Sequence, residues 1–453
     1  MQPDADHLIV GYSGGLDSQV LLHGLATGRQ RWPERRLEAI YIDHGLQAAS
    51  VAWGEHCARI CQALDVPFRI MRIDARPASG ESPEAAARQA RYAVFAAALG
   101  PNSALLTAHH RDDQAETLLL QLLRGAGPHG LAAMPAVSRL GEGRLLRPFL
   151  DRDRAELLAY AREHGLHWIE DASNTDIDFD RNYLRHRVLP LLRDRWPAAN
   201  RTLARSARLC AETAAWLDEQ AAADLVDVAT DRPDCLSISG LGRLSEQRQR
   251  HVLRHWLRQL QLPIPDARQL RHLLQDTLTA AADRNPWVRW PGGEGRRYRD
   301  ALYALSPLPL HDARQTYVWP SNADGWPPLD LAGVGQLRMQ ATIGTGLRAA
   351  GLSGGSLIVG FRQGGERFRP AGRAHGQELK KLLQEAGIPP WERDRLPLIY
   401  LPLASHRLAS QLLPSREEGE RLPEGCLLLA VVGLGVAAEA AAGPGELGWQ
   451  PFV

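Results

Sequence analysis

The string Ser13-Gly14-Gly15-Leu16-Asp17-Ser18 is the first part of the chain whose residue types could do chemistry. Apolar runs precede it at 8–12 and follow it at 20–22, which predicts a buried strand, a tight glycine loop and the start of a helix. Glycines let the backbone approach a ligand closely, and the free amides and dipole of a helix N-terminus favour an anion. The string therefore predicts a phosphate site, with an ordinary capped turn as the alternative.

Two further polar groups follow apolar runs and could share this site. Asp43-His44-Gly45 comes after the run 37–42, and the string His109-His110-Arg111-Asp112-Asp113 comes after the run 104–108. In parallel sheets, ligands bind beyond the carboxyl ends of the strands. The three polar groups therefore predict one site.

Charged residues at helical spacing extend this prediction. Asp113 and Glu116 are three residues apart, so both carboxylates lie on one face of a predicted helix. Two acids at a helix start could merely complement the dipole, or they could hold Mg²⁺ or a cationic substrate. Arg88 and Arg91 have the same spacing, and a solvated basic face is the alternative to phosphate contact.

Basic residues are distributed unevenly along the chain. Residues 181–208 hold eight arginines and one acid, Asp194, which favours a phosphate-binding stripe. Lysine occurs only at Lys380 and Lys381, so no Walker A lysine and no Schiff-base lysine exist near the N-terminus. Residues 361–397 hold eight Lys or Arg and five acids, which suits an RNA backbone or any mixed surface.

The elements that must position these residues alternate between strands and helices. Strands are expected at 8–12, 37–42, 68–73 and 104–108, and helices at 18–25, 50–64 and 82–99. This alternation predicts an α/β fold with a doubly wound parallel sheet over 1–212. We expect a mostly helical region at 213–306 that ends in a β-hairpin, a Pro-rich linker at 307–353 and a small α+β domain at 354–453.

Bulk composition narrows the class of protein. The 453 residues carry a net charge of +1, so any nucleic-acid surface must be a local patch. Five cysteines form no CxxC pair, which argues against disulfide frameworks and zinc ribbons. We find no signal peptide and no apolar run near the ~18 residues of a membrane helix, so we expect a cytoplasmic protein without a membrane partner.

The Ser13–Ser18 string resembles the pyrophosphate loop of the ATP-pyrophosphatase, or N-type, synthetases. Further motifs together resemble bacterial tRNA(Ile)-lysidine synthetases, and the resemblance covers nearly the whole chain. These motifs are residues 41–46, 84–92, 107–117, 123–125, 147–148, 170–174 and 181–185, with GGERFRP and LKKLLQEAGIPPWER near the C-terminus. The sequence departs from the pattern at Tyr12 and Gln19, neither of which removes a group that the chemistry needs.

The resemblance implies a reaction and its substrates. Such enzymes use ATP to adenylate the C2 oxygen of the wobble cytidine in a tRNA(Ile) with a CAU anticodon. The amine of free L-lysine then attacks that carbon and expels AMP. By the same resemblance, the Ser13–Ser18 loop with Asp43 and His109 binds ATP, and Asp17 engages Mg²⁺.

The resemblance also assigns the remaining site residues. Asp113, Glu116 and Arg185 receive lysine, and either carboxylate could accept its proton. Phosphate or tRNA contacts fall to other basic residues: Arg88, Arg91, Arg181, Lys380 and Lys381. For the two lysines, a plain surface helix is an equal alternative. The sequence allows a homodimer without fixing the oligomeric state.

Three other functions were weighed against this interpretation. A tRNA thiolase would need cysteines at the site, and Cys57 and Cys61 are interpreted as buried small hydrophobes. A glutamine-fed synthetase would need a glutaminase nucleophile, such as an N-terminal cysteine, and none is present. A non-catalytic tRNA-binding module is disfavoured by the intact acids and by His109.

Overall fold

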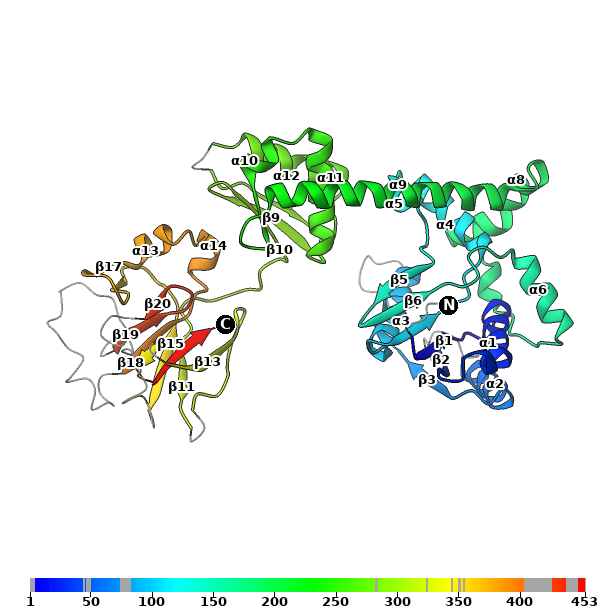
Figure 1. The fold of residues 1–453 in the computed structure, drawn as a ribbon, viewed down its shortest axis with the longest axis horizontal. Coiled ribbons are helices and arrows are strands. Elements are labelled where there is room, and N and C mark those ends of the chain that lie inside the picture. Colours follow the sequence, from blue (N-terminus) through cyan, green and yellow to red (C-terminus); the bar gives the residue numbers. More distant parts are fainter. Residues whose placement is uncertain are drawn as a thin grey trace. The chain divides into compact units, whose positions relative to one another are not determined.

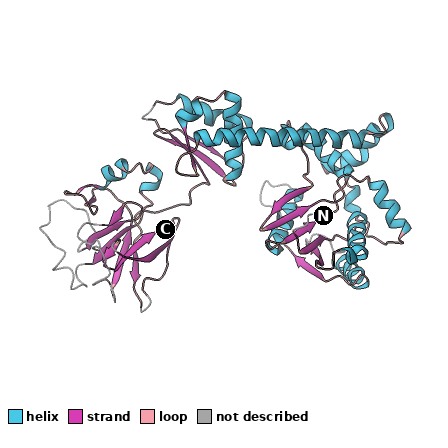
Figure 2. Ribbon diagram, viewed as in Figure 1, coloured by secondary structure: helices cyan, strands magenta, loops and turns pink. Residues whose placement is uncertain are grey.

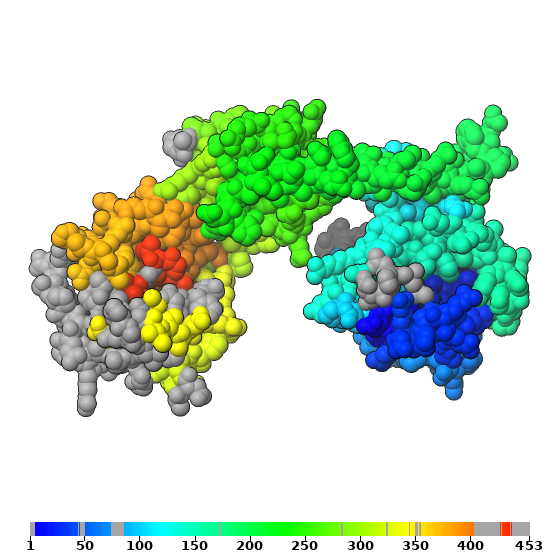
Figure 3. Space-filling model, in the orientation of Figure 1, coloured from blue at the N-terminus to red at the C-terminus, as the bar shows by residue number. Residues whose placement is uncertain are grey.

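The computed structural model describes residues 5–43, 45, 50–73, 83–281, 284–322, 325–343, 345–348, 352, 355–402, 426–436 and 447–452. The chain forms two compact units, 1–221 and 222–453 (Figures 1 and 3). The long helix α9 (Ala199–Val228) crosses the division between them. Within the described residues, no helix is long and apolar enough to span a membrane.

A six-stranded sheet forms the centre of the first unit. Its order is β3 (Phe68–Arg72), β2 (Arg36–Asp43), β1 (His7–Gly11), β4 (Ser103–Leu106), β6 (Gly143–Leu146) and β5 (Val137–Leu140). All neighbours are parallel except β5 and β6. The strand order reverses between β1 and β4, which is where a ligand binds in such sheets. This confirms the doubly wound parallel sheet.

Helices cover both faces of this sheet because successive strand residues point to opposite sides (Figures 1 and 2). Leu8 and Val10 of β1 share a core with residues of α1 (Leu16–Gly28) and α2 (Ser50–Ala63). Ile9, between them, packs in a second core with Phe95 of α3 (Pro83–Ala98). The three predicted helices are therefore present, and α1 and α2 lie on the face opposite α3.

Short elements complete the first unit. They are η1 (Arg29–Arg31), α4 (Arg111–Leu123), α5 (Pro128–Leu131), α6 (Arg154–Glu163), η2 (Ala172–Thr175), α7 (Asp180–Tyr183), a π-helical turn η3 (Leu184–Val188) and α8 (Leu189–Arg195). Helix α6 packs on α1 through Leu157 and Ala161. Single π-helical turns are rare and often mark functional sites.

The second unit begins with a helical layer on a small sheet. Helices α10 (Ile238–Gly242), α11 (Glu246–Gln259) and α12 (Ala267–Thr279) share a core with the sheet around Trp256 and Trp290. The sheet order is β7 (Cys235–Ser237), β10 (Ala301–Leu305), β9 (Gly293–Tyr298) and β8 (Trp287–Trp290), all antiparallel. The expected hairpin is thus part of a four-stranded sheet.

The remaining residues build antiparallel sheets around one core. The first has the order β11 (Tyr317–Pro320), β15 (Ser356–Gly360), β18 (Leu398–Pro402), β19 (Cys426–Val431) and β20 (Gly435–Val436). The second has the order β12 (Leu329–Leu331), β13 (Gly335–Ile343), β21 (Leu447–Phe452) and β14 (Leu347–Arg348). A pair, β16 (Arg367–Phe368) and β17 (Gln377–Glu378), lies next to α13 (Leu379–Glu385) and α14 (Pro390–Arg393) in the chain.

The span 307–353 differs from the linker expected there. It contains β11 to β14, and β11 pairs with β15 while β13 pairs with β21. Trp319 and Trp326 of this span are buried in the core of the C-terminal sheets. Burial of two tryptophans makes these residues part of the domain, because each ring removes a large apolar area from water.

Candidate active site

The loop between β1 and α1 has the geometry of an anion cradle. Gly15 is the N-cap of α1, and within the described chain no side chain caps that end, so the first-turn amides stay available. The Ser13 and Ser18 hydroxyl oxygens lie 3.1 Å apart, and Ser18 donates to the Gly15 carbonyl at 3.0 Å. The alternative of an ordinary capped turn is therefore not what forms here.

The two departures at the loop compensate each other. Tyr12 and Gln19 are both buried, and the Tyr12 hydroxyl donates to the Gln19 side-chain carbonyl. The residue before the loop thus forms a hydrogen bond with the residue that follows the loop.

Gly14 has a backbone conformation and surroundings that require glycine. Its φ is +78°, and a Cβ would lie 2.6 Å from Ile169 Cδ1 and 2.9 Å from Cys57 Sγ. Burial raises the pKa of Cys57 to about 12, so this residue is a neutral thiol that supports the loop. That role agrees with the hydrophobic interpretation of Cys57 and not with sulfur transfer.

We predict that Gly14→Ala destabilises the loop. The positive φ and the overlap with Ile169 should lower the free energy of unfolding by about 2 kcal/mol and weaken ATP binding. Thermal unfolding and titration with ATP check this. Gly28→Ala, which meets nothing within 4 Å, is the matched control, and equal behaviour of the two variants would contradict the prediction.

Asp17 connects the loop to the residues that follow β4. Its Oδ2 lies 3.6 Å from Nε2 of His110, which lies 3.4 Å from Asp113 Oδ2. Burial lowers the pKa of His110, but the contact with Asp17 and the charges of the neighbouring acids outweigh burial and raise it. His110 therefore lies between two carboxylates that favour its protonated form. From the sequence, a role in ATP binding was predicted for the adjacent His109 and no role was predicted for His110.

A buried ion-pair network joins α4 to the α7–η3 segment. Glu116, only 1% exposed, accepts hydrogen bonds from Arg181 Nε at 2.8 Å and Arg185 Nε at 2.7 Å. Arg185 also donates to Asp113 Oδ1 at 3.1 Å. Burial raises the pKa of Asp113, but His110 and Arg181 outweigh it and hold the pKa below its ordinary value. Two arginines therefore bind the acid pair, Asp113 and Glu116.

This network changes the interpretation of the arginine-rich segment. Arg181 and Arg185 face acids of α4, and further members pair with acids outside the segment or along α9. Arg193 pairs with Asp112, Arg201 with Asp153 and Arg208 with Glu212. Five arginines of the segment therefore have acidic partners in this structure, and phosphate binding by the segment stays a prediction.

His109 lies beside this network as a neutral base. Its Nδ1 is 2.9 Å from the Thr107 hydroxyl oxygen. Burial lowers the pKa of His109, the charge of Asp113 opposes this and nearby arginines add to it, which together bring the pKa to about 3. The ring can therefore exchange hydrogen bonds with a substrate without carrying charge.

The lowered pKa of His109 determines how this residue contributes to stability at different pH values. Because its folded-state pKa lies below the ordinary 6.5, its contribution to stability is present above pH 6.5 and is lost as the pH falls from there. We predict that the His109 imidazole stays neutral at pH 5. Histidine NMR, assigned with His109→Gln, checks this, and a signal titrating near 6.5 that vanishes in the variant would contradict it.

The remaining predicted residues lie in several places. Asp43 ends β2, accepts a hydrogen bond from the Gly45 amide at 2.9 Å and lies 3.8 Å from Arg72, and its contact with ATP stays a prediction. Arg88 and Arg91 lie on α3 beside Tyr92. Lys380 and Lys381 are exposed on α13, which belongs to the second unit.

Comparison with known proteins decides the family. A model of the PP-loop domain matches residues 2–192, one of the TilS substrate binding domain matches 236–303, and one of the TilS substrate C-terminal domain matches 357–402. The tRNA(Ile)-lysidine synthase of Methylococcus capsulatus is 46% identical over 392 residues, covering 86% of this chain and 88% of that protein. The chain belongs to the tRNA(Ile)-lysidine synthase family.

A second relative has the same name. The tRNA(Ile)-lysidine synthase of Coxiella burnetii is 45% identical over 86% of both chains. Among solved structures, a TilS C-terminal domain is similar over 30% of this chain and 97% of that one, at 22% identity and a TM-score of 0.19. The PP-loop match contains the Ser13–Ser18 loop, the acid pair and both arginines of the network. Membership of the lysidine synthase family confirms the resemblance found in the sequence.

Proposed function

We propose that this chain forms lysidine in tRNA(Ile): it uses ATP to adenylate C2–O of the wobble cytidine in a CAU anticodon and then joins free L-lysine to that carbon. The observation that carries the proposal is the continuous run of contacts from the loop acid Asp17 through His110 to Asp113 and Glu116. A site for a polyphosphate and a site for a cationic nucleophile therefore meet within one unit.

The loop residues suit ATP with Mg²⁺. Asp17 Oδ1 is buried and has no hydrogen-bond partner among the described residues, which fits a hard cation at this oxygen. No group of three acid, histidine or cysteine ligands occurs in the described chain, and Mg²⁺ commonly uses one or two carboxylates with phosphate oxygens. When bound, Mg²⁺ would offset the charge of the leaving pyrophosphate. The loop amides and the hydroxyls of Ser13 and Ser18 would hold that group.

The acid–arginine network can bind lysine if the charged groups of lysine replace existing ion-pair partners in the network. Lysine carries two amines and one carboxylate, so an ammonium placed at Glu116 or Asp113 would take the position of an arginine. The displaced Arg185 or Arg181 would then be free to pair with the lysine carboxylate. The attacking amine must first lose a proton, and either carboxylate of the acid pair could accept it.

The second unit would bind the body of the tRNA. We assign Lys380 and Lys381 to backbone contacts, since both are exposed on one short helix. A cytoplasmic location and a homodimer complete the proposal, and light scattering checks the latter.

One incubation tests this function against its rivals. The protein is mixed with ATP, labelled lysine and a transcript of tRNA(Ile), and lysine transfer and AMP release are measured. We expect ATP-dependent transfer of lysine to the RNA. In a parallel incubation with sulfide in place of lysine, transfer of sulfur to the RNA would indicate a thiolase, and RNA binding without AMP release would indicate a binding module. Either result would overturn the proposal.

A further inference from the structure

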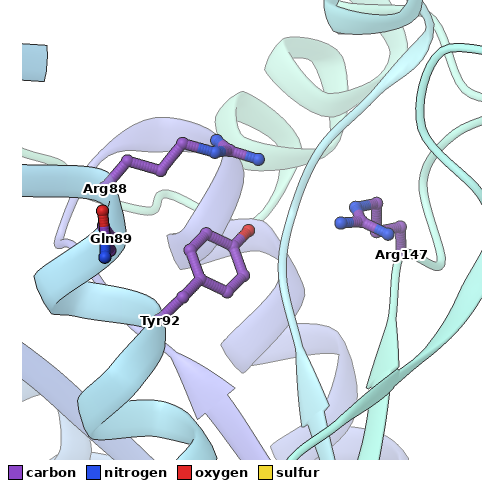
Figure 4. Close-up of a pocket in the computed structure, with 4 residues that line it drawn as sticks. All are labelled: Arg88, Gln89, Tyr92 and Arg147. Atoms are coloured by element: carbon purple, nitrogen blue, oxygen red, sulfur yellow. The ribbon is translucent and has the colours of Figure 1, made fainter. Parts of the chain in front are cut away.

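A cationic pocket lies between α3 and the residue that follows β6 (Figure 4). Arg88, Gln89 and Tyr92 of α3 line it together with Arg147, around a volume of about 340 Å³. Figure 4 shows the Tyr92 ring between the two arginines, with its hydroxyl directed toward Arg147. None of the acids of the ion-pair network lines this pocket.

Among the described residues, the two arginines of the pocket have no acidic partner. Within the described residues, no carboxylate lies within 4.0 Å of Arg88 or Arg147. Arg147 is only 7% exposed; one terminal nitrogen donates to the Pro135 carbonyl at 2.7 Å, and its Nε is buried without an acceptor. Burial lowers the pKa of Arg147, the interaction with the Tyr92 hydroxyl opposes this, and the charge of Arg88 lowers the pKa further. A buried guanidinium with an unused donor requires an anion for balance.

The position of the pocket indicates which anion this is. The Thr107 amide donates to the Leu146 carbonyl at 3.0 Å, so Arg147, the next residue, lies beside the residues that follow β4. In the sheet, β4 separates β1, which leads into the pyrophosphate loop, from β6, which leads into Arg147. Displacement at phosphorus places the attacking and leaving oxygens roughly in line. With pyrophosphate leaving on the β1 side, the attacking base enters from the β6 side.

We propose that this pocket binds a backbone phosphodiester of the RNA strand, at a nucleotide next to the reacting cytidine. Arg88 and Arg147 pair with the phosphate oxygens, and the Tyr92 hydroxyl donates a further hydrogen bond. The half-buried Tyr92 ring, which Arg88 overlies at 4.9 Å, and the exposed Gln89 amide border the space for the adjoining nucleoside. The inference rests on the proposed function and names a contact that positions the base.

The test combines protein variants with neutral RNA linkages. A series of anticodon stem–loop RNAs is made, each with one methylphosphonate at a different linkage around the wobble cytidine. The affinity of the full chain for each RNA is then measured. For the unaltered protein, we expect one linkage to weaken binding about ten-fold. Arg88→Gln should lower the affinity for the unmodified RNA about ten-fold. In this variant, the neutral linkage should lower the affinity by less than about a further two-fold. Tyr92→Phe, which keeps the ring, should weaken binding about three-fold.

Controls separate the pocket from general charge and from ATP binding. Arg139→Gln removes an exposed arginine of β5 and should keep the full linkage effect. ATP affinity should stay within about two-fold in every variant. A full linkage effect in Arg88→Gln, or weaker ATP binding with unchanged RNA binding, would overturn the inference.

The inference and the proposed function fail in different ways. If the unaltered protein transfers lysine and shows no sensitive linkage, the pocket assignment is wrong and the function stands. If the sensitive linkage responds to Arg88→Gln and no lysine is transferred, the function is wrong and the RNA contact stands.

Discussion

Asp17→Asn should lower the rate of AMP formation by about 100-fold or more while tRNA affinity stays within about two-fold. The amide keeps the shape of the side chain but removes the charge that faces both His110 and the pyrophosphate loop. Its unpartnered Oδ1 would no longer offer a carboxylate oxygen to Mg²⁺. Release of AMP and filter binding of labelled tRNA measure the two quantities separately.

The matched control for this variant is Asp65→Asn. Asp65 lies in the same unit with a 90% exposed side chain that pairs with Arg29, so its replacement removes the same charge away from the loop. Activity of the control should remain. Equal loss of AMP formation and tRNA binding in Asp17→Asn would contradict a role confined to ATP and its metal.

Glu116→Gln should raise the lysine concentration needed for half-maximal rate by about 100-fold and leave adenylation largely intact. Both arginines of the network bond to this carboxylate, which is 1% exposed. Neutralising it leaves Arg181 and Arg185 sharing Asp113 alone, so the site becomes net positive and repels the lysine ammonium. Steady-state rates over a lysine series, with AMP release measured in parallel, check the result.

Circular dichroism confirms that this variant is folded, since loss of a buried carboxylate can also destabilise the unit. Glu163→Gln, at the exposed end of α6, is the control and should leave the lysine requirement unchanged. An unchanged lysine requirement in Glu116→Gln would remove that residue from the lysine site.

The sequence predicts the sheet of the first unit well because its strands are buried apolar runs between glycine or polar breaks. The predicted run 37–42 is contained in β2 (Arg36–Asp43), and the predicted helix 50–64 corresponds to α2 (Ser50–Ala63). The prediction that polar groups meet at the strand ends holds for Asp17 and Asp113, which His110 joins. That prediction needs only the parallel direction of the strands, because their carboxyl ends then lie at one edge of the sheet.

Other features depend on contacts that sequence order does not show. Arg181, Arg185 and Arg193 appeared to lack acids because their partners lie on α4, 65 to 81 residues earlier in the chain. The pocket of Arg88 and Arg147 joins a helix and a strand end that are far apart in the chain. Prolines are frequent in 307–328 and suggested a linker, whereas the pairing of β11 and β13 with later strands and the burial of Trp319 and Trp326 show that the span belongs to a core.

The central claim is that the loop and the acid–arginine network form one site that acts in two steps. The most direct measurement incubates the protein with ATP and tRNA(Ile) without lysine, isolates the RNA-bound complex and then adds lysine alone. We expect an adenylated RNA to accumulate with release of pyrophosphate, and then to become lysidine with release of AMP and no further ATP. Failure of the RNA to become adenylated until lysine is present, or a need for fresh ATP in the second step, would contradict this account.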